Sequence, residues 1–123
     1  MAELARFLFQ KGHFSAKNKR VKPGAFNPGT RKDLSVFYVA GIGEPRKRLI
    51  AAAVSTVGGR DVKARAEILL SDLGGTRLSF VRDNDPIWRH GNLVGWTLGD
   101  DDAARMDRVE HATALASRVS LHS

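Results

Sequence analysis

The residue types best suited to chemistry concentrate in one segment of the 123-residue sequence, Pro86 to Trp96. Its His90 can donate or accept a proton near neutral pH, and Arg89 can hold a phosphate or carboxylate group. Asn92 supplies hydrogen bonds in both directions. We therefore take His90, Arg89 and Asn92 as candidate catalytic residues, with His90 as the general acid or base.

A structural interpretation fits the same segment. In this interpretation Trp88 and Trp96 belong to the core, while His90 and Asn92 satisfy the backbone of a loop that leads into an edge strand. The preceding Asp83-Asn-Asp-Pro86 stretch has the composition of a turn, because Asp and Asn side chains bond to the local backbone. The sequence therefore assigns these acids to the turn and offers His90 no other carboxylate to orient it.

The composition argues against several other kinds of site. The chain has no cysteine, which excludes a disulfide, a thiolate nucleophile and a cysteine-based zinc or iron–sulfur site. The four histidines lack the spacing of metal ligands, and the glycine pairs match no nucleotide-binding motif. We expect neither a bound metal nor a cofactor.

Charge is the second feature with functional content. The net charge of +7 arises entirely within residues 1–32, where eight basic side chains face a single acid. Clustered cations attract a polyanion and release its counterions on binding. The residues expected to contact nucleic acid are Lys17, Lys19, Arg20, Lys22, Arg31 and Lys32.

These two features support competing hypotheses of function. The first is a nucleic-acid-binding module that contacts the phosphate backbone of RNA or DNA, with Phe14 and Phe26 for stacking or anchoring. The second is a small metal-independent enzyme that acts on RNA or a nucleotide through His90. The third is a subunit of a larger bacterial complex that docks its basic N-terminal loop against an acidic protein. The same cations also fit a solvated surface loop.

The elements that must position these residues follow from periodicity. Strands are expected at residues 6–9 and 33–39, and a further pair, at 62–70 and 76–81, is expected to form a hairpin. Helical spacing predicts helices at about 44–57 and 101–120. The sequence thus predicts an α+β fold with a small mixed or antiparallel sheet of about four or five strands packed by two helices.

The two predicted helices carry more specific expectations. Arg46, Lys47 and Arg48 fall in the first turn of the earlier helix, where the helix dipole disfavours cations. This placement suggests an anion or an acidic partner nearby. For the later helix, the spacing predicts an apolar stripe and places Arg105, Arg108, Glu110 and Arg118 on the wet face. The stripe comprises Met106, Val109, Ala112 or Thr113, Leu115 or Ala116, and Val119.

Length and hydropathy set the overall organisation. We expect a single domain over residues 1–123 with a basic, Gly- and Pro-containing loop at about 11–32, in which Phe26 anchors the chain to the core. No apolar stretch approaches the roughly 18 residues of a membrane span. The N-terminus lacks the pattern of a secretory signal, so the expected location is the cytoplasm, with no membrane partner.

The segment His90-Gly-Asn-Leu-Val-Gly-Trp96, followed by a helix, resembles small uncharacterised bacterial proteins. The resemblance extends from about Ala64 to Ala116 and touches Leu34 to Val36. It implies no activity and assigns no catalytic residue.

Overall fold

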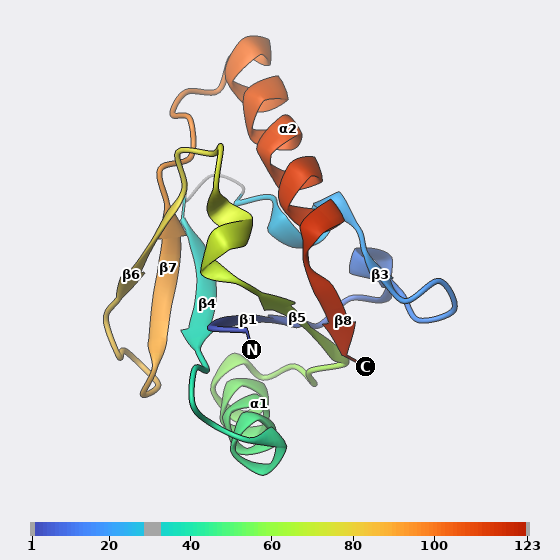
Figure 1. Ribbon diagram of the computed structural model, residues 1–123, viewed down its shortest axis with the longest axis vertical. Coiled ribbons are helices and arrows are strands. Elements are labelled where there is room, and N and C mark those ends of the chain that lie inside the picture. Colours follow the sequence, from blue (N-terminus) through green and yellow to red (C-terminus); the bar gives the residue numbers. More distant parts are fainter. Residues whose placement is uncertain (1, 29–32, 123) are drawn as a thin grey trace.

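The computed structural model describes residues 2–28 and 33–122. Its main element is a six-stranded antiparallel sheet in the order β6-β7-β4-β1-β5-β8, with one helix on each face (Figure 1). The strands are β1 (Leu4–Leu8), β4 (Leu34–Tyr38), β5 (Ala64–Ile68), β6 (Ser79–Arg82), β7 (His90–Val94) and β8 (Ser120–His122). The helices are α1 (Glu44–Gly58) and α2 (Asp102–Arg118). The predicted α+β class is confirmed, with more strands than expected.

β1 lies inside the sheet because both of its faces are apolar. Leu4 and Leu8 point into a cluster beneath α2, whereas Ala5 and Phe7 point into a second cluster beneath α1. This alternation follows from the two-residue period of a strand. The sheet is therefore covered on both sides, with a larger core under α2 and a smaller one under α1.

Helix α1 begins after Gly43 with Pro45 in its first turn, as predicted. Two of the three cations of its first turn have acidic partners within the chain. Lys47 is buried and its Nζ lies 3.0 Å from an Oε atom of Glu67, while Arg48 approaches Glu44. Burial alone would raise the pKa of Glu67, but hydrogen bonds from Arg65 and Lys47 outweigh it and hold that pKa below its usual range.

Helix α2 buries the predicted stripe in its C-terminal half, at Ala112, Leu115 and Ala116, but not in its N-terminal half. Leu115 is fully buried, yet Met106 and Val109 are 60% and 45% exposed. Arg108, predicted on the wet face, is only 6% exposed and donates hydrogen bonds to the carbonyls of Thr97 and Gly99. The N-terminal half of the helix thus packs against a polar loop, where a buried guanidinium replaces an apolar contact.

Two predictions about strand pairing are wrong. The segments at 62–70 and 76–81 contain β5 and β6, but these strands lie in opposite halves of the sheet and do not form a hairpin. β5 pairs with β1 and β8, and β6 pairs with β7. β7 is also not an edge strand, because β4 and β6 flank it. The C-terminal strand β8 was not predicted.

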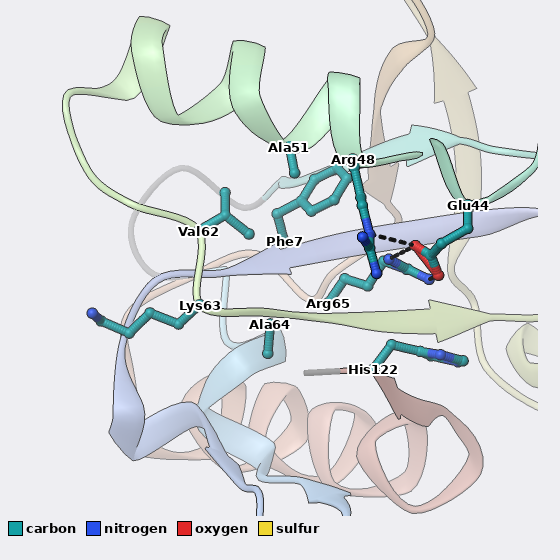
Figure 2. A pocket seen from close by; sticks show the side chains of 9 residues that line it. All are labelled: Phe7, Glu44, Arg48, Ala51, Val62, Lys63, Ala64, Arg65 and His122. Carbon is teal, nitrogen blue, oxygen red and sulfur yellow. Dashed lines mark hydrogen bonds and ion pairs between the residues drawn. The ribbon is translucent and has the colours of Figure 1, made fainter. Parts of the chain in front are cut away.

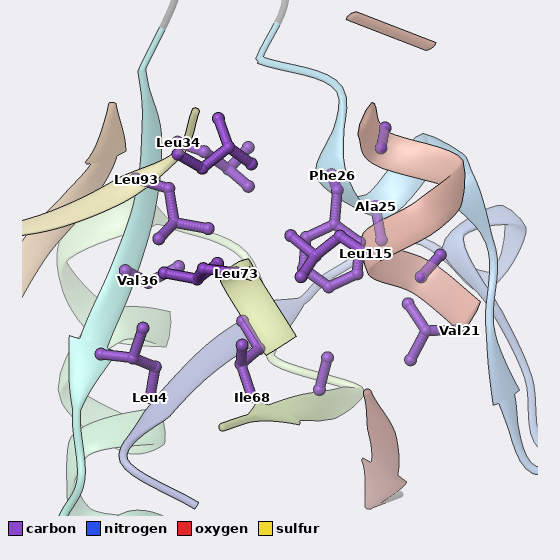
Figure 3. Packing of buried hydrophobic residues seen from close by; sticks show 14 of the residues in the cluster. Leu4, Val21, Ala25, Phe26, Leu34, Val36, Ile68, Leu73, Leu93 and Leu115 are labelled. Atoms are coloured by element: carbon purple, nitrogen blue, oxygen red, sulfur yellow. The ribbon is translucent and has the colours of Figure 1, made fainter. Parts of the chain in front are cut away.

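The basic loop contains ordered structure. A short hairpin of β2 (Phe14–Ser15) and β3 (Arg20–Val21) is flanked by the 3₁₀ turns η1 (Lys11–His13) and η2 (Pro23–Phe26), and a further 3₁₀ turn, η4 (Leu70–Leu73), follows β5. The Phe26 side chain is fully buried and lies beside Leu115 of α2 (Figure 3). Phe26 therefore anchors the loop, as predicted, and is not accessible for base stacking.

Within residues 2–28 and 33–122, neither helix combines the length and the apolar character that crossing a membrane requires.

Candidate active site

Three neighbouring strands bring polar side chains together on the α1 face of the sheet. In the β4–β7 register, Ser35 lies opposite Asn92 and Phe37 lies opposite His90. Asp83 directly follows β6, and its N–H donates to the carbonyl of His90 over 2.9 Å. Since side chains alternate between faces, Ser35, His90, Asn92 and Asp83 all project from the same face.

Gly91 allows the strands to approach at this point. A Cβ at position 91 would lie 2.4 Å from the carbonyl oxygen of Val81 and 2.5 Å from the Phe80 ring. Real atoms do not tolerate such distances, so any larger residue would push β6 away from β7. Glycine at position 91 is therefore needed to hold β6, and with it Asp83, close to His90.

Ser35, His90 and Asp83 form a continuous chain of hydrogen bonds. The Ser35 Oγ lies 2.7 Å from Nε2 of His90, and Nδ1 of His90 lies 2.7 Å from Oδ1 of Asp83. The carboxylate also accepts hydrogen bonds from the Asp85 N–H at 3.0 Å and from Nδ2 of Asn92 at 3.3 Å. Asn92 thus holds the carboxylate that holds His90.

The charge of Asp83 fixes the direction of this chain. The hydrogen bond from His90 is the main cause that lowers the pKa of Asp83 below its usual range, and the Asp85 backbone N–H adds to it. An ionised carboxylate only accepts hydrogen bonds, so Nδ1 of His90 must carry the proton. In neutral His90, Nε2 is then the acceptor of the Ser35 hydroxyl proton, which is the arrangement that activates a serine nucleophile.

The two ends of the hydrogen-bonded chain are exposed, and its middle is largely buried. Ser35 is exposed, and the Asp83 side chain is 41% exposed, whereas the His90 side chain is only 11% exposed. The His90 and Phe37 rings pack edge to face, with 5.2 Å between ring centroids. Packing on Phe37 and the bond to Asp83 together restrict the imidazole to one orientation.

Arg6 of β1 adds a cation beside Ser35. Pairing between β1 and β4 covers only Leu4 with Tyr38 and Ala5 with Phe37, so it ends before Arg6. The Arg6 guanidinium donates from Nε to the Ala25 carbonyl at 2.7 Å and from a terminal nitrogen to the Ser35 carbonyl at 2.8 Å.

Burial, with a smaller contribution from the charge of Arg60, lowers the pKa of Arg6 to about 10. Arg6 therefore remains a cation at neutral pH. It also fixes the backbone that carries the Ser35 hydroxyl.

Two hollows meet at this site. A polar cleft of about 620 Å³ extends over Asn27, Asp33, Asp85 and Asn92. A smaller cavity of about 160 Å³ lies beneath the C-terminal turns of α1 and is lined mainly by apolar side chains. Arg6, Ser35, Pro86 and His90 line both hollows. The hydroxyl of Ser35 thus lies where an apolar and a polar compartment join.

A third hollow, of about 340 Å³, lies between α1 and β5 and has a different character (Figure 2). Several of its charged groups pair with one another. Arg65 bonds Glu44 through both terminal nitrogens and Glu67 through Nε at 2.7 Å. The Nε2 atom of His122 also lies 3.6 Å from Glu67. No serine is among the described lining residues of this hollow. Its ion pairs join α1 to β5.

The structure separates the three residues predicted to be catalytic. His90 and Asn92 belong to the hydrogen-bonded chain, but Arg89 does not line the cleft. Its guanidinium donates to the carbonyls of Tyr38 and Ala40 and stacks on Trp88, 4.4 Å from the ring centroid. Arg89 thus fixes the β7 end of the turn.

Three residues of the site were missed from the sequence: Arg6, Ser35 and Asp83. For Ser35 a signal existed, since it is the one polar residue in the apolar run Leu34–Tyr38. The turn role assigned to Asp83 is correct as far as it goes, because Oδ1 accepts from the Asp85 N–H. The same atom also accepts from His90, which no local pattern reveals.

The predicted nucleic-acid-binding residues lie on another part of the molecule. Lys17, Lys19 and Arg20 are exposed on the β2–β3 hairpin. Lys19, Arg20 and Lys22 line a groove of about 490 Å³ between this hairpin and the C-terminal end of α2. Arg31 and Lys32 lie outside the described residues.

Among the residues that the structure describes, no three His, Cys, Asp or Glu side chains are grouped to hold a metal ion. Comparisons of the chain with protein-family models, with curated proteins and with solved structures found no match.

Proposed function

We propose that this chain is a metal-independent serine hydrolase that cleaves small esters. The observation that carries the proposal is the hydrogen-bonded chain from Ser35 through His90 to Asp83, with both bonds at 2.7 Å. A serine hydroxyl is a weak nucleophile unless an oriented base removes its proton, and this geometry supplies the base and its orienting carboxylate.

The residues have distinct roles in the proposed reaction. Ser35 Oγ bonds to the ester carbonyl carbon while its proton passes to Nε2 of His90, and the carbonyl oxygen takes up negative charge. The bond to the alcohol oxygen then breaks, and that oxygen receives the proton from His90. A water molecule repeats the sequence on the acyl-serine, which releases a carboxylic acid and restores Ser35.

Arg6 lines both hollows beside Ser35 and supplies positive charge there. It is the one arginine or lysine among the described residues that line the two hollows. A cation already fixed by bonds to backbone carbonyls does not have to reorganise during the reaction, which is the basis of electrostatic stabilisation of a transition state.

The charges of the cleft favour an ester over a phosphate polymer as substrate. Its described lining contains three carboxylates, those of Asp33, Asp83 and Asp85, against the single cation Arg6. Such a lining repels a polyanion at short range. A neutral ester avoids this repulsion, and we therefore favour it over RNA or a nucleotide at His90.

The proposal is tested by the hydrolysis of p-nitrophenyl esters with acyl chains of two to eight carbons. We expect the wild-type protein to accelerate hydrolysis and Ser35→Ala to lower kcat/KM by roughly 10³-fold or more. Ser79→Ala is the matched control, because Ser79 is an exposed strand residue of the same sheet. Equal rates for the wild-type protein and Ser35→Ala would exclude Ser35 as the nucleophile.

The hairpin supports a second candidate function, binding of a nucleic-acid backbone. The supporting observation is that three cations, Lys19, Arg20 and Lys22, line one groove, with Lys17 exposed nearby. Each phosphate contact releases counterions, so binding through these residues depends steeply on salt.

Replacing Lys17, Lys19, Arg20 and Lys22 by Ala should weaken binding to single-stranded RNA or DNA. The slope of log K against log salt should flatten by roughly 3, since each phosphate contact contributes about 0.7 to 0.9. The melting temperature should change little. The control replaces four exposed cations elsewhere, Arg46, Arg48, Arg77 and Arg105. An equal loss in the control, or an unchanged slope in the hairpin variant, argues against a specific surface.

A further inference from the structure

We propose that the apolar cavity beside Ser35 is the acyl-binding pocket and that it selects short acyl chains of about four to six carbons. This inference rests on the proposed serine hydrolase. It adds that the acyl group of the ester binds in the cavity, and it adds which acyl lengths the protein prefers.

The lining of the cavity supports this assignment. Phe37 lies on the sheet side, Val54 and Val57 lie three residues apart on α1, and Ile87 comes from the turn before β7. Residues three apart in a helix share a face, so both valines can line the same wall. The polar groups among the lining residues are Arg6, Ser35 and His90, which are those of the proposed reaction.

The size of the cavity limits the length of the acyl chain. Its volume is about 160 Å³. An apolar protein cavity of about 150 Å³ accommodates benzene, which has six heavy atoms. A butanoyl to hexanoyl group therefore fits, whereas a longer chain must leave through the mouth, where Val57 is 60% exposed.

The neighbouring cleft assigns the other half of the ester. The cleft shares Ser35 and His90 with the cavity but is lined by carboxylates and amides. A polar alcohol group and the water that hydrolyses the acyl-serine are better solvated there than among valine and phenylalanine side chains. Ser35 thus separates an acyl side from a leaving-group side.

The first arm of the test measures kcat/KM for p-nitrophenyl esters of increasing acyl length. Burial of each added methylene should raise kcat/KM about fourfold until the cavity is full, with a maximum at four to six carbons. Val54→Phe narrows the cavity and should move the maximum to the acetyl ester, because the longer acyl chains no longer fit. Val109→Phe, on the exposed side of α2, is the control and should leave the profile unchanged.

The second arm does not depend on the reaction. Hexanamide, an unreactive neutral analogue, is titrated into the Ser35→Ala protein while the methyl NMR signals of Val54 and Val57 are followed. We expect saturable shifts, and the shifts of the Val57 signals should be lost when Val54→Phe is added. Binding of hexanamide without any ester hydrolysis by the wild-type protein would contradict the proposed hydrolase activity but not the proposed binding pocket. If Ser35 hydrolyses esters but Val54→Phe does not alter the dependence of kcat/KM on acyl length, the proposed pocket is contradicted and the proposed hydrolase activity is not.

Discussion

Replacing Asp83 by Asn should lower ester turnover by roughly 10³- to 10⁴-fold while the fold survives. The reason is the tautomer of His90. The ionised Asp83 accepts the proton of Nδ1 and so leaves Nε2 free to accept the proton of Ser35. An Asn amide can instead donate to Nδ1, which places the imidazole proton on Nε2 and removes the base.

The measurement is kcat together with the melting temperature of each variant. Asp85→Asn is the matched control, because Asp85 lines the same cleft and belongs to the same turn. It should retain turnover within a few fold. Similar losses in both variants, or near wild-type turnover in Asp83→Asn, would contradict the role of Asp83.

The lowered pKa of Asp83 gives this prediction a pH range. A carboxylate with a depressed pKa stays ionised at and above its ordinary value of about 3.9 and is protonated only as the pH falls further. The contribution of Asp83 to turnover should therefore be complete throughout the neutral range. A loss of activity between pH 5 and pH 8 must have another origin than Asp83.

The second large effect concerns the core under α2. Leu115 is fully buried and lies beside Phe26 in the cluster of Figure 3. Leu115→Asp places a carboxylate there without a partner, at a cost of several kcal/mol. Since single domains are stable by only about 5–15 kcal/mol, most of the protein should unfold at room temperature.

Circular dichroism and thermal melting check this result. Met106→Asp is the informative control, because the sequence places Met106 on the same apolar stripe, whereas the structure leaves it 60% exposed. Its effect should be within about 0.5 kcal/mol. A folded Leu115→Asp protein, or equal damage from Met106→Asp, would show that α2 packs through another face.

Local sequence patterns predicted the positions of the helices better than the pairing of the strands. The helices at 44–57 and 101–120 correspond to α1 and α2 within a few residues, because periodicity, Pro45 and the caps act over one or two turns. Strand pairing depends on segments far apart in the chain. The sequence-adjacent hairpin of β5 and β6 was therefore a reasonable prediction and a wrong one.

The site shows the same limit. His90 and Asn92 could be proposed from the sequence because an unusual residue type in a glycine-containing segment is a local signal. Ser35 lies 55 residues from His90, and only the register between β4 and β7 brings them together. Arg108 illustrates the converse, since a charged residue at a helical position predicts solvent but here satisfies buried carbonyls.

The proposal that Ser35 is a nucleophile is tested most directly by covalent trapping. The wild-type protein is incubated with a small alkyl fluorophosphonate, which reacts with serines activated by a neighbouring base, and the adduct is mapped by peptide mass spectrometry. We expect one adduct per chain on the peptide that contains Ser35, and its formation should slow by at least 10²-fold in His90→Ala. No adduct, or an adduct on another serine that forms equally fast in His90→Ala, would contradict the account.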